Sequence, residues 1–271
     1  MQTAIIVSEK DPAGINIKEE LIRLFEFERL NEKFENNFIY EFNKNTRLYA
    51  TKNDSIYCEN IDKKIKADLF IFATKHQSKS GIPSLSVHSI GNWGKAELGG
   101  KSNSLCIAPA AYMKEAIIHL EQYNEIKFDV VQECTHHGPC LEKPAMFIEI
   151  GSSEKQWKNK EAAIIIAKTI IAILSSEPPA YKTAFGIGGL HTTPNFKKIM
   201  LKSDIAVGHV CPKYSLQNLT EELVREAVKK TEPFAELVIL DWKGLGEHKD
   251  KIVDMLKSLK LDFVKTSKLG S

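Results

Sequence analysis

Apolar runs alternate with amphipathic stretches along most of this chain, and short polar turns separate them. Residues 3–8 are continuously apolar enough to predict a first strand. Residues 15–30 then place apolar side chains at helical spacing, and the prediction extends this helix to Leu30. Residues 36–61 alternate apolar and polar positions between Asn-rich turns, which favours short strands or a hairpin. The chain is therefore expected to open with a strand followed by a helix.

From residue 67 onward, strand-like and helix-like patterns follow one another. The strand patterns cover residues 67–76, 84–91, 129–137, 145–153, 183–191, 204–210, 236–244 and 261–266. The helix patterns cover residues 108–124, 159–176, 220–230 and 248–259, with Asn159 and Thr220 as N-caps. This alternation predicts an α/β fold with a mixed, mostly parallel sheet and helices on both faces. We expect a single domain over residues 1–271, or two tightly packed lobes, with residues 268–271 as a tail.

Composition and charge exclude several classes of protein. With 43% hydrophobic residues the chain can bury a full core, and no apolar run approaches the roughly 20 residues that cross a bilayer. Its five cysteines form no CxxC pair, which indicates reduced thiols and a cytoplasmic location. A net charge of only +2 argues against a protein that coats DNA or other nucleic acid indiscriminately. No membrane or DNA partner is expected.

Charge is nevertheless concentrated locally. Residues 75–101 contain a single acid, Glu97, but four lysines: Lys75, Lys79, Lys95 and Lys101. This segment either guides a phosphate-bearing ligand or is a solvated surface in a lysine-rich chain.

Histidines are the side chains that point most directly to chemistry. Six of the eight follow apolar, strand-like runs: His76, His88, His136, His137, His191 and His209. In an open α/β sheet the ends of such strands border the ligand crevice. Because imidazole transfers protons near neutral pH and binds metals, this arrangement predicts a hydrolytic or metal-assisted site.

Residues 133–139 contain the densest motif, in which Thr135, His136 and His137 precede Gly138 and a proline. Neighbouring side chains of a strand point to opposite faces, so the two imidazoles converge only if the strand has already ended. One of them would then act as base or metal ligand, and the other would orient it or bind substrate.

Two later motifs add histidines. Residues 186–194 combine glycines with His191 and Thr192, without dinucleotide-binding spacing and without a helix pattern directly after them. His209 and Lys213 lie at the end of the strand expected at 204–210. We interpret His191 and His209 as catalytic or metal-binding residues and Thr192 and Lys213 as substrate contacts.

A glycine-rich loop at residues 91–104 contains Asn92, Trp93, Gly94 and Lys95. Its backbone N–H groups are suited to an anion, and Trp93 offers a face on which a base can stack. The alternative is a surface loop in which Trp93 is docked on the core.

The words GNWG, ECTHHGP, GIGGLHTTPNF and GHVCPKY occur together in this order, and with them the chain resembles the archaeal and plant type of D-aminoacyl-tRNA deacylase. The resemblance spans nearly the whole chain, except that residues 30–65 match no pattern. It implies a core like that of phosphorylases and peptidyl-tRNA hydrolase, and hydrolysis of the ester between a D-amino acid and the end of tRNA. It also implies zinc as a cofactor.

The resemblance and the residue chemistry define one set of candidate residues. The catalytic candidates are His136, His137, His191, His209 and Thr135. The substrate-binding candidates are Asn92, Trp93, Gly94, Lys95, Gly138, Thr192 and Lys213. The candidate zinc ligands are His136, His137, His191 and His209, although no HxH or HExxH spacing is present. The expected partner is the acceptor end of aminoacyl-tRNA, and a monomer is favoured.

Three alternatives stay open at this point. In the first, the imidazoles position water and the terminal hydroxyl of tRNA assists, without a metal. A nucleoside phosphorylase would use the same kind of core and a phosphate-binding loop. A non-catalytic tRNA-binding module would keep its affinity for tRNA without the histidines.

Overall fold

The computed structural model describes residues 1–269. Eight strands form the larger sheet: β1 (Thr3–Ser8), β2 (Glu28–Phe34), β3 (Asn37–Asn43), β4 (Thr46–Thr51), β5 (Leu69–Gln77), β6 (Ser84–Ser89), β10 (Asp129–Gln132) and β11 (Ala145–Ser152). Four form the smaller sheet: β12 (Lys182–Ile187), β13 (Ile205–Cys211), β15 (Leu237–Leu240) and β16 (Phe263–Lys265). Two short pairs are β7 (Gly91–Asn92) with β8 (Ser104–Leu105), and β9 (Ala108–Pro109) with β14 (Thr231–Glu232).

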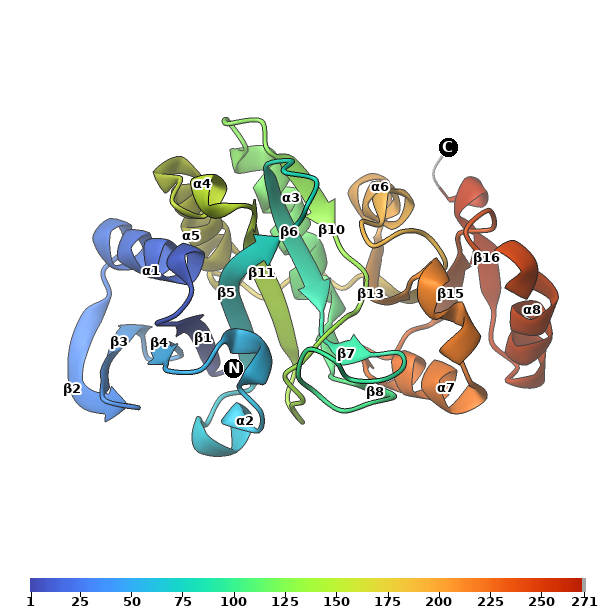
Figure 1. Ribbon diagram of the computed structural model, residues 1–271, viewed down its shortest axis with the longest axis horizontal. Coiled ribbons are helices and arrows are strands. Elements are labelled where there is room, and N and C mark those ends of the chain that lie inside the picture. The colour runs from blue at the N-terminus through green and yellow to red at the C-terminus, as the bar shows by residue number, and fades with distance from the viewer. Residues whose placement is uncertain (270–271) are drawn as a thin grey trace.

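The helices are α1 (Pro12–Leu24), α2 (Ile61–Lys64), α3 (Ala110–Tyr123), α4 (Glu154–Trp157), α5 (Lys160–Leu174), α6 (Pro194–Lys202), α7 (Glu221–Lys229) and α8 (Lys249–Ser258). The larger sheet has the order β10-β6-β11-β5-β1-β4-β3-β2, and the smaller one β13-β12-β15-β16. Figure 1 shows the two sheets side by side, from β2 at one end to α8 at the other.

Most neighbouring strands are parallel, and the exceptions matter for the site. The smaller sheet is parallel throughout, whereas β6 runs antiparallel to β11 and β2, β3 and β4 form antiparallel neighbours. The expectation of a mixed, mostly parallel α/β fold is thus confirmed.

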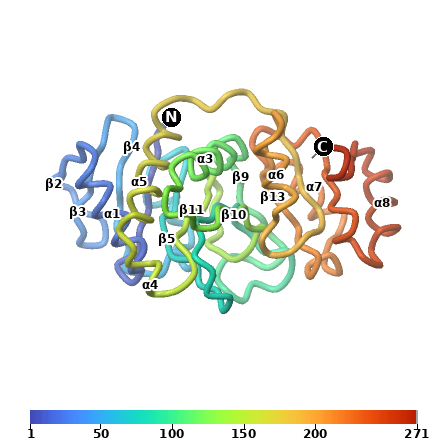
Figure 2. The backbone as a smooth tube through the Cα atoms, turned by 90° about the horizontal axis from the view of Figure 1, so that it is seen from above, coloured from blue at the N-terminus to red at the C-terminus, as the bar shows by residue number. Residues whose placement is uncertain are grey.

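Each face of the larger sheet has its own cover. Helices α1, α3 and α5 pack on one face through an apolar cluster that includes Ile71, Ile117 and Val207 (Figure 2). That cluster is continuous with the smaller sheet because α3 also contacts β13. The opposite face carries Phe72 and is covered by the short helix α2 and by loops. This loop-covered face leaves room for a site.

The first helix is shorter than expected. Asp11 caps it, because its Oδ1 accepts hydrogen bonds of 2.9 Å from the amides of Ala13 and Gly14, and the helix ends at Leu24. Leu30 belongs to β2 instead, so extending the helix that far was wrong. Over the few residues between Leu24 and Leu30, the apolar positions of a half-buried strand fit helical spacing equally well, so the pattern did not distinguish the two.

Other expectations can be compared directly. Asn159 and Thr220 are N-caps of α5 and α7, as expected. Helix α6 was not expected, because it is only nine residues long and its apolar pattern is correspondingly short. Of the expected tail at 268–271, Lys268 ends a 3-10 turn and Leu269 packs against the core, while residues 270–271 lie outside the described residues. Within residues 1–269, no helix combines the length and apolar character that a bilayer crossing requires.

Candidate active site

Three adjacent strands carry polar side chains on the loop-covered face of the larger sheet. These side chains are Thr74 and His76 on β5, Ser86 and His88 on β6, and Glu149 on β11. They alternate along each strand, and the pairing places Glu149 opposite both Thr74 and Ser86. Because β6 is antiparallel to β11, the ends of β5 and β6 lie at opposite edges. The imidazoles therefore meet on the face of the sheet, not at one edge as the strand-end argument expected.

Glu149 is the buried anion at the centre of this face, with 3% of its surface exposed. Thr74 donates a hydrogen bond of 2.7 Å to its Oε1, and His76 and His88 approach its Oε2 at 3.6 Å. Burial alone raises the pKa of a carboxyl group, but the contacts with both imidazoles hold the pKa of Glu149 well below its usual range. Glu149 is therefore a fixed negative charge.

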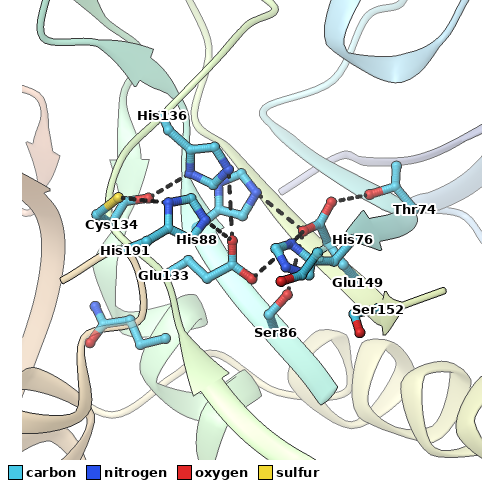
Figure 3. A network of polar contacts seen from close by, with 12 residues as sticks. Thr74, His76, Ser86, His88, Glu133, Cys134, His136, Glu149, Ser152 and His191 are labelled. Atoms are coloured by element: carbon cyan, nitrogen blue, oxygen red, sulfur yellow. Dashed lines mark hydrogen bonds and ion pairs between the residues drawn. The ribbon is translucent and has the colours of Figure 1, made fainter. Parts of the chain in front are cut away.

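Glu133 supplies a second buried carboxylate, directly after β10. Its Oε2 lies 3.0 Å from His191 Nε2 and 3.7 Å from His136 Nε2, and its Oε1 lies 3.2 Å from His76 Nδ1. Burial opposes ionisation, yet the hydrogen bond with His191 and the nearby imidazoles of His88 and His76 lower the pKa of Glu133. Figure 3 shows the two carboxylates facing the imidazoles from neighbouring elements.

The carboxylates act in turn on two histidines. The pKa of His191 rises to about 10, first through its contact with Cys134 Sγ at 3.6 Å and then through Glu133. Burial would lower the pKa of His76, but the hydrogen bond to Glu149 and the two carboxylate charges raise it. Both imidazoles are thus suited to carry a proton near neutral pH.

Three further imidazoles contact the backbone through one ring nitrogen. His88, His136 and His137 each direct Nδ1 to a backbone carbonyl, at 3.0, 2.8 and 2.6 Å respectively. This contact fixes the tautomer with the proton on Nδ1 and leaves the Nε2 lone pair free. Burial and the neighbouring His88 lower the pKa of His136 well below its usual range and that of His137 to about 4. Both rings are therefore neutral at physiological pH.

These three imidazoles fit a metal ion. One nitrogen from each lies within 4.8 Å of the others, and His88 Nε2 is buried without a hydrogen-bond partner among the described residues. Neutral imidazoles whose other nitrogen donates to a backbone carbonyl are the usual arrangement of histidine ligands to zinc. A second such group joins His76, Glu133 and His191.

The convergence of His136 and His137 has a local cause. Strand β10 already ends at Gln132, and His137 adopts a left-handed backbone conformation with φ of 44°. The alternation of a strand is thereby broken, and the two ring centroids lie 4.3 Å apart. The early strand end expected from the Gly-Pro turn is confirmed.

The cluster opens into connected cavities. One, of about 490 Å³, is lined by His76, His136 and His191 together with Tyr57 and Leu98. A neighbouring cavity of about 420 Å³ shares His136, His137 and Leu98 and extends to the glycine-rich loop. Solvent and a substrate can therefore reach the imidazoles.

His209 does not join this cluster, which corrects its expected position. It is fully buried on β13, with Nδ1 3.1 Å from Thr135 Oγ1 and Nε2 2.9 Å from the carbonyl of Cys106. Thr135 is likewise buried, and its hydroxyl contacts Ser89 at 2.7 Å. A histidine at a strand end can face either side of its sheet, and the sequence does not say which. His209 and Thr135 tie the two sheets together.

Buried His209 predicts acid sensitivity. Burial lowers its pKa to about 4, so the unfolded chain binds a proton that the folded chain rejects between about pH 6.5 and pH 4. Stability is therefore full above pH 6.5 and falls as the pH approaches 4. We expect the advantage of the wild type over His209→Gln, in free energy of unfolding by urea, to shrink by about 3 kcal/mol between pH 7.5 and pH 4. A constant difference would contradict the assignment.

The loop candidates divide into buried and accessible side chains. Trp93 is 3% exposed, stacks on Phe185 and donates to the carbonyl of Thr135 at 3.1 Å, so it is docked on the core and offers no free stacking face. Asn92 bonds to the carbonyl of Gly99 at 3.0 Å. Lys95 is exposed and, with Gly94, lines the 420 Å³ cavity.

The remaining candidates lie around the cluster. Gly138 packs tightly against Gly100, which leaves no space for a side chain. Thr192 forms a β-bridge with Glu133 and is exposed. Lys213 is exposed. It is the first residue of the 3-10 turn that also contains Tyr214.

Sequence reasoning missed several members of the cluster. Glu133 and Glu149 were not among the candidates, and His76 and His88 were noted among the six histidines but were given no catalytic, substrate-binding or metal-binding role. A detectable signal was present, since a charged residue inside the apolar run at 145–150 is costly unless it is paired.

Comparisons with known proteins agree with the resemblance. A sequence model of the D-aminoacyl-tRNA deacylase family matches residues 63–264. A D-aminoacyl-tRNA deacylase of Pyrococcus furiosus is 39% identical over 269 residues, which cover 96% of this chain and 98% of that protein. One of Methanosarcina mazei is 36% identical over 279 residues, which cover 98% of this chain and 92% of that protein. A crystal structure of a conserved protein of unknown function matches with a TM-score of 0.91 and 34% identity, over 99% of this chain and 96% of that one.

Proposed function

We propose that this chain, which belongs to the D-aminoacyl-tRNA deacylase family, cleaves its substrate at the imidazole and carboxylate cluster on the larger sheet. The enzyme is a hydrolase of the ester bond in D-aminoacyl-tRNA. The observation that carries the assignment of the site is the convergence of His76, His88, His136 and His191 on two buried carboxylates, with His137 beside His88 and His136.

Hydrolysis of this ester needs a water nucleophile and donors for the tetrahedral oxyanion. Water adds to the carbonyl carbon, the bond from that carbon to the ribose oxygen breaks, and the oxygen leaves with a proton. His191 is protonated through Cys134 and Glu133, and 40% of its side chain is exposed toward substrate. We assign to it the hydrogen bond to the oxyanion or leaving oxygen, and to Glu133 the positioning of His191.

We further propose zinc as the cofactor, held by His88, His136 and His137. When bound, zinc supplies a Lewis acid that lowers the pKa of a coordinated water toward 7. Glu149 lies 3.6 Å from His88 Nε2 and holds negative charge beside this nitrogen. The set differs from the expected one, since His88 takes the place of His209, and His191 is kept for proton donation.

The substrate enters, in this proposal, from the side of the glycine-rich loop. Lys95, Gly94 and Tyr214 line the 420 Å³ cavity, and exposed Lys213 is the neighbour of Tyr214 in sequence. The two lysines provide positive charge for the acceptor end of tRNA. Because aminoacyl-tRNA is used in the cytoplasm, the substrate supports a cytoplasmic location.

Purified enzyme with D- and L-tyrosyl-tRNA tests this proposal. We expect release of D-tyrosine alone, loss of that release after treatment with a chelator, and recovery with zinc. Undiminished turnover in the metal-depleted enzyme would exclude a catalytic zinc. Phosphate-dependent cleavage of a free nucleoside, with no release of D-tyrosine, would favour the phosphorylase alternative.

A further inference from the structure

A second cavity, of about 450 Å³, adjoins the cluster on the side away from the glycine-rich loop. Hydroxyl groups form much of its wall, and we call it the serine cavity: Ser78, Ser80, Ser84, Ser152, Thr192 and Thr193. Glu133 and His76 also line it, and His76 lines the cavity on the other side as well. An ester bound at Glu133 would therefore have one compartment on each side.

The charges of the serine cavity differ from those near the glycine-rich loop. Asp129 and Glu133 bring carboxylates to it, whereas the carboxylate of Glu121 is paired with a lysine. Its lysine, Lys197, is already occupied, because Nζ lies 2.8 Å from Glu121 Oε1 and 2.8 Å from the carbonyl of Val130. Negative charge with a neutralised lysine favours a cation over a phosphate.

Apolar side chains complete the wall. Ile82, Phe128, Val130 and Val131 line the serine cavity beside the hydroxyl groups. A volume of about 450 Å³ lies in the range of small-molecule sites, and apolar walls with a few polar groups are typical of them.

We propose that the serine cavity holds the amino-acid part of the substrate. The side chain of the amino acid packs against Val131 and Phe128. The nucleotide part then lies on the side of Lys95. This inference rests on the proposed deacylation, because it assigns the two halves of that substrate to the two compartments.

Val131→Trp tests the position of the side chain, because the indole fills part of the serine cavity. We expect kcat/KM for D-tyrosyl-tRNA to fall at least about tenfold, and that for D-alanyl-tRNA by less than about threefold. Ile15→Trp, on an exposed position of α1, should change neither substrate. Equal losses on both substrates, or no loss on D-tyrosyl-tRNA, would overturn the proposal.

Two checks keep these outcomes separate from other failures. If Val131→Trp lowers the Tm, Ile82→Trp repeats the test from an exposed loop of the cavity. Wild-type enzyme that releases neither D-amino acid contradicts the proposed function itself. Wild-type enzyme that releases both, combined with variants that do not discriminate, contradicts only the placement of the amino acid.

Discussion

Glu133→Gln is expected to lower kcat for D-aminoacyl-tRNA by roughly 1000-fold, the scale on which positioned acids and bases contribute to catalysis. The amide keeps the shape of the side chain but removes the charge that His76, His136 and His191 face at 3.2, 3.7 and 3.0 Å. Without that charge the pKa of His191 falls, and less imidazolium is present near pH 7. The measurement is single-turnover release of D-tyrosine from saturating D-tyrosyl-tRNA.

A matched control distinguishes this effect from a general effect of charge. Glu142 forms a surface ion pair with Lys63 and is 78% exposed, so Glu142→Gln should leave kcat within about twofold of wild type, as expected for exposed ion pairs. KM should change less than kcat in Glu133→Gln, because only 1% of the side chain of Glu133 is exposed and its two oxygens contact His76 and His191. A loss confined to KM would mean that Glu133 contributes to binding and not to the chemical step.

The sequence predicted the elements better than it predicted their directions. Apolar runs and helical spacing located β5, β11, α3 and α5, because each buries a continuous apolar surface. Nothing in residues 84–89 shows that β6 pairs antiparallel with β11, since strand direction depends on the connections between strands. For that reason the position of the site, on a face and not at an edge, could not be predicted.

The candidate residues show the same limit. His136 and His137 were identified because a Gly-Pro turn follows them, and that turn is a local signal. His209 was placed in the site although its ring faces Cys106 and Thr135, because the direction of a side chain from β13 depends on tertiary packing. Glu149 was not among the candidates, because nothing local in residues 145–153 shows the imidazoles of β5 and β6 that surround it in the structure.

His136→Gln and His88→Gln are expected to have the second largest effect, through loss of zinc. If His88, His136 and His137 hold the ion, either substitution removes one of three ligands. Bound zinc should then fall from about one per chain toward zero, and activity more than about 100-fold, because even changes outside the ligand shell cost 10- to 100-fold. His119→Gln is the control, since His119 lies on α3 beside Glu115, away from the cluster. The measurement is metal analysis of the purified variants together with turnover of D-tyrosyl-tRNA.

Because His88 is fully buried, a lower Tm in His88→Gln alone is explained by packing, and the less buried His136 then decides the assignment. Full zinc content in His136→Gln would instead place the ion at a group without His136, either His76, Glu133 and His191 or His88, Glu133 and Glu149, whose ligand atoms also lie within 4.8 Å of one another.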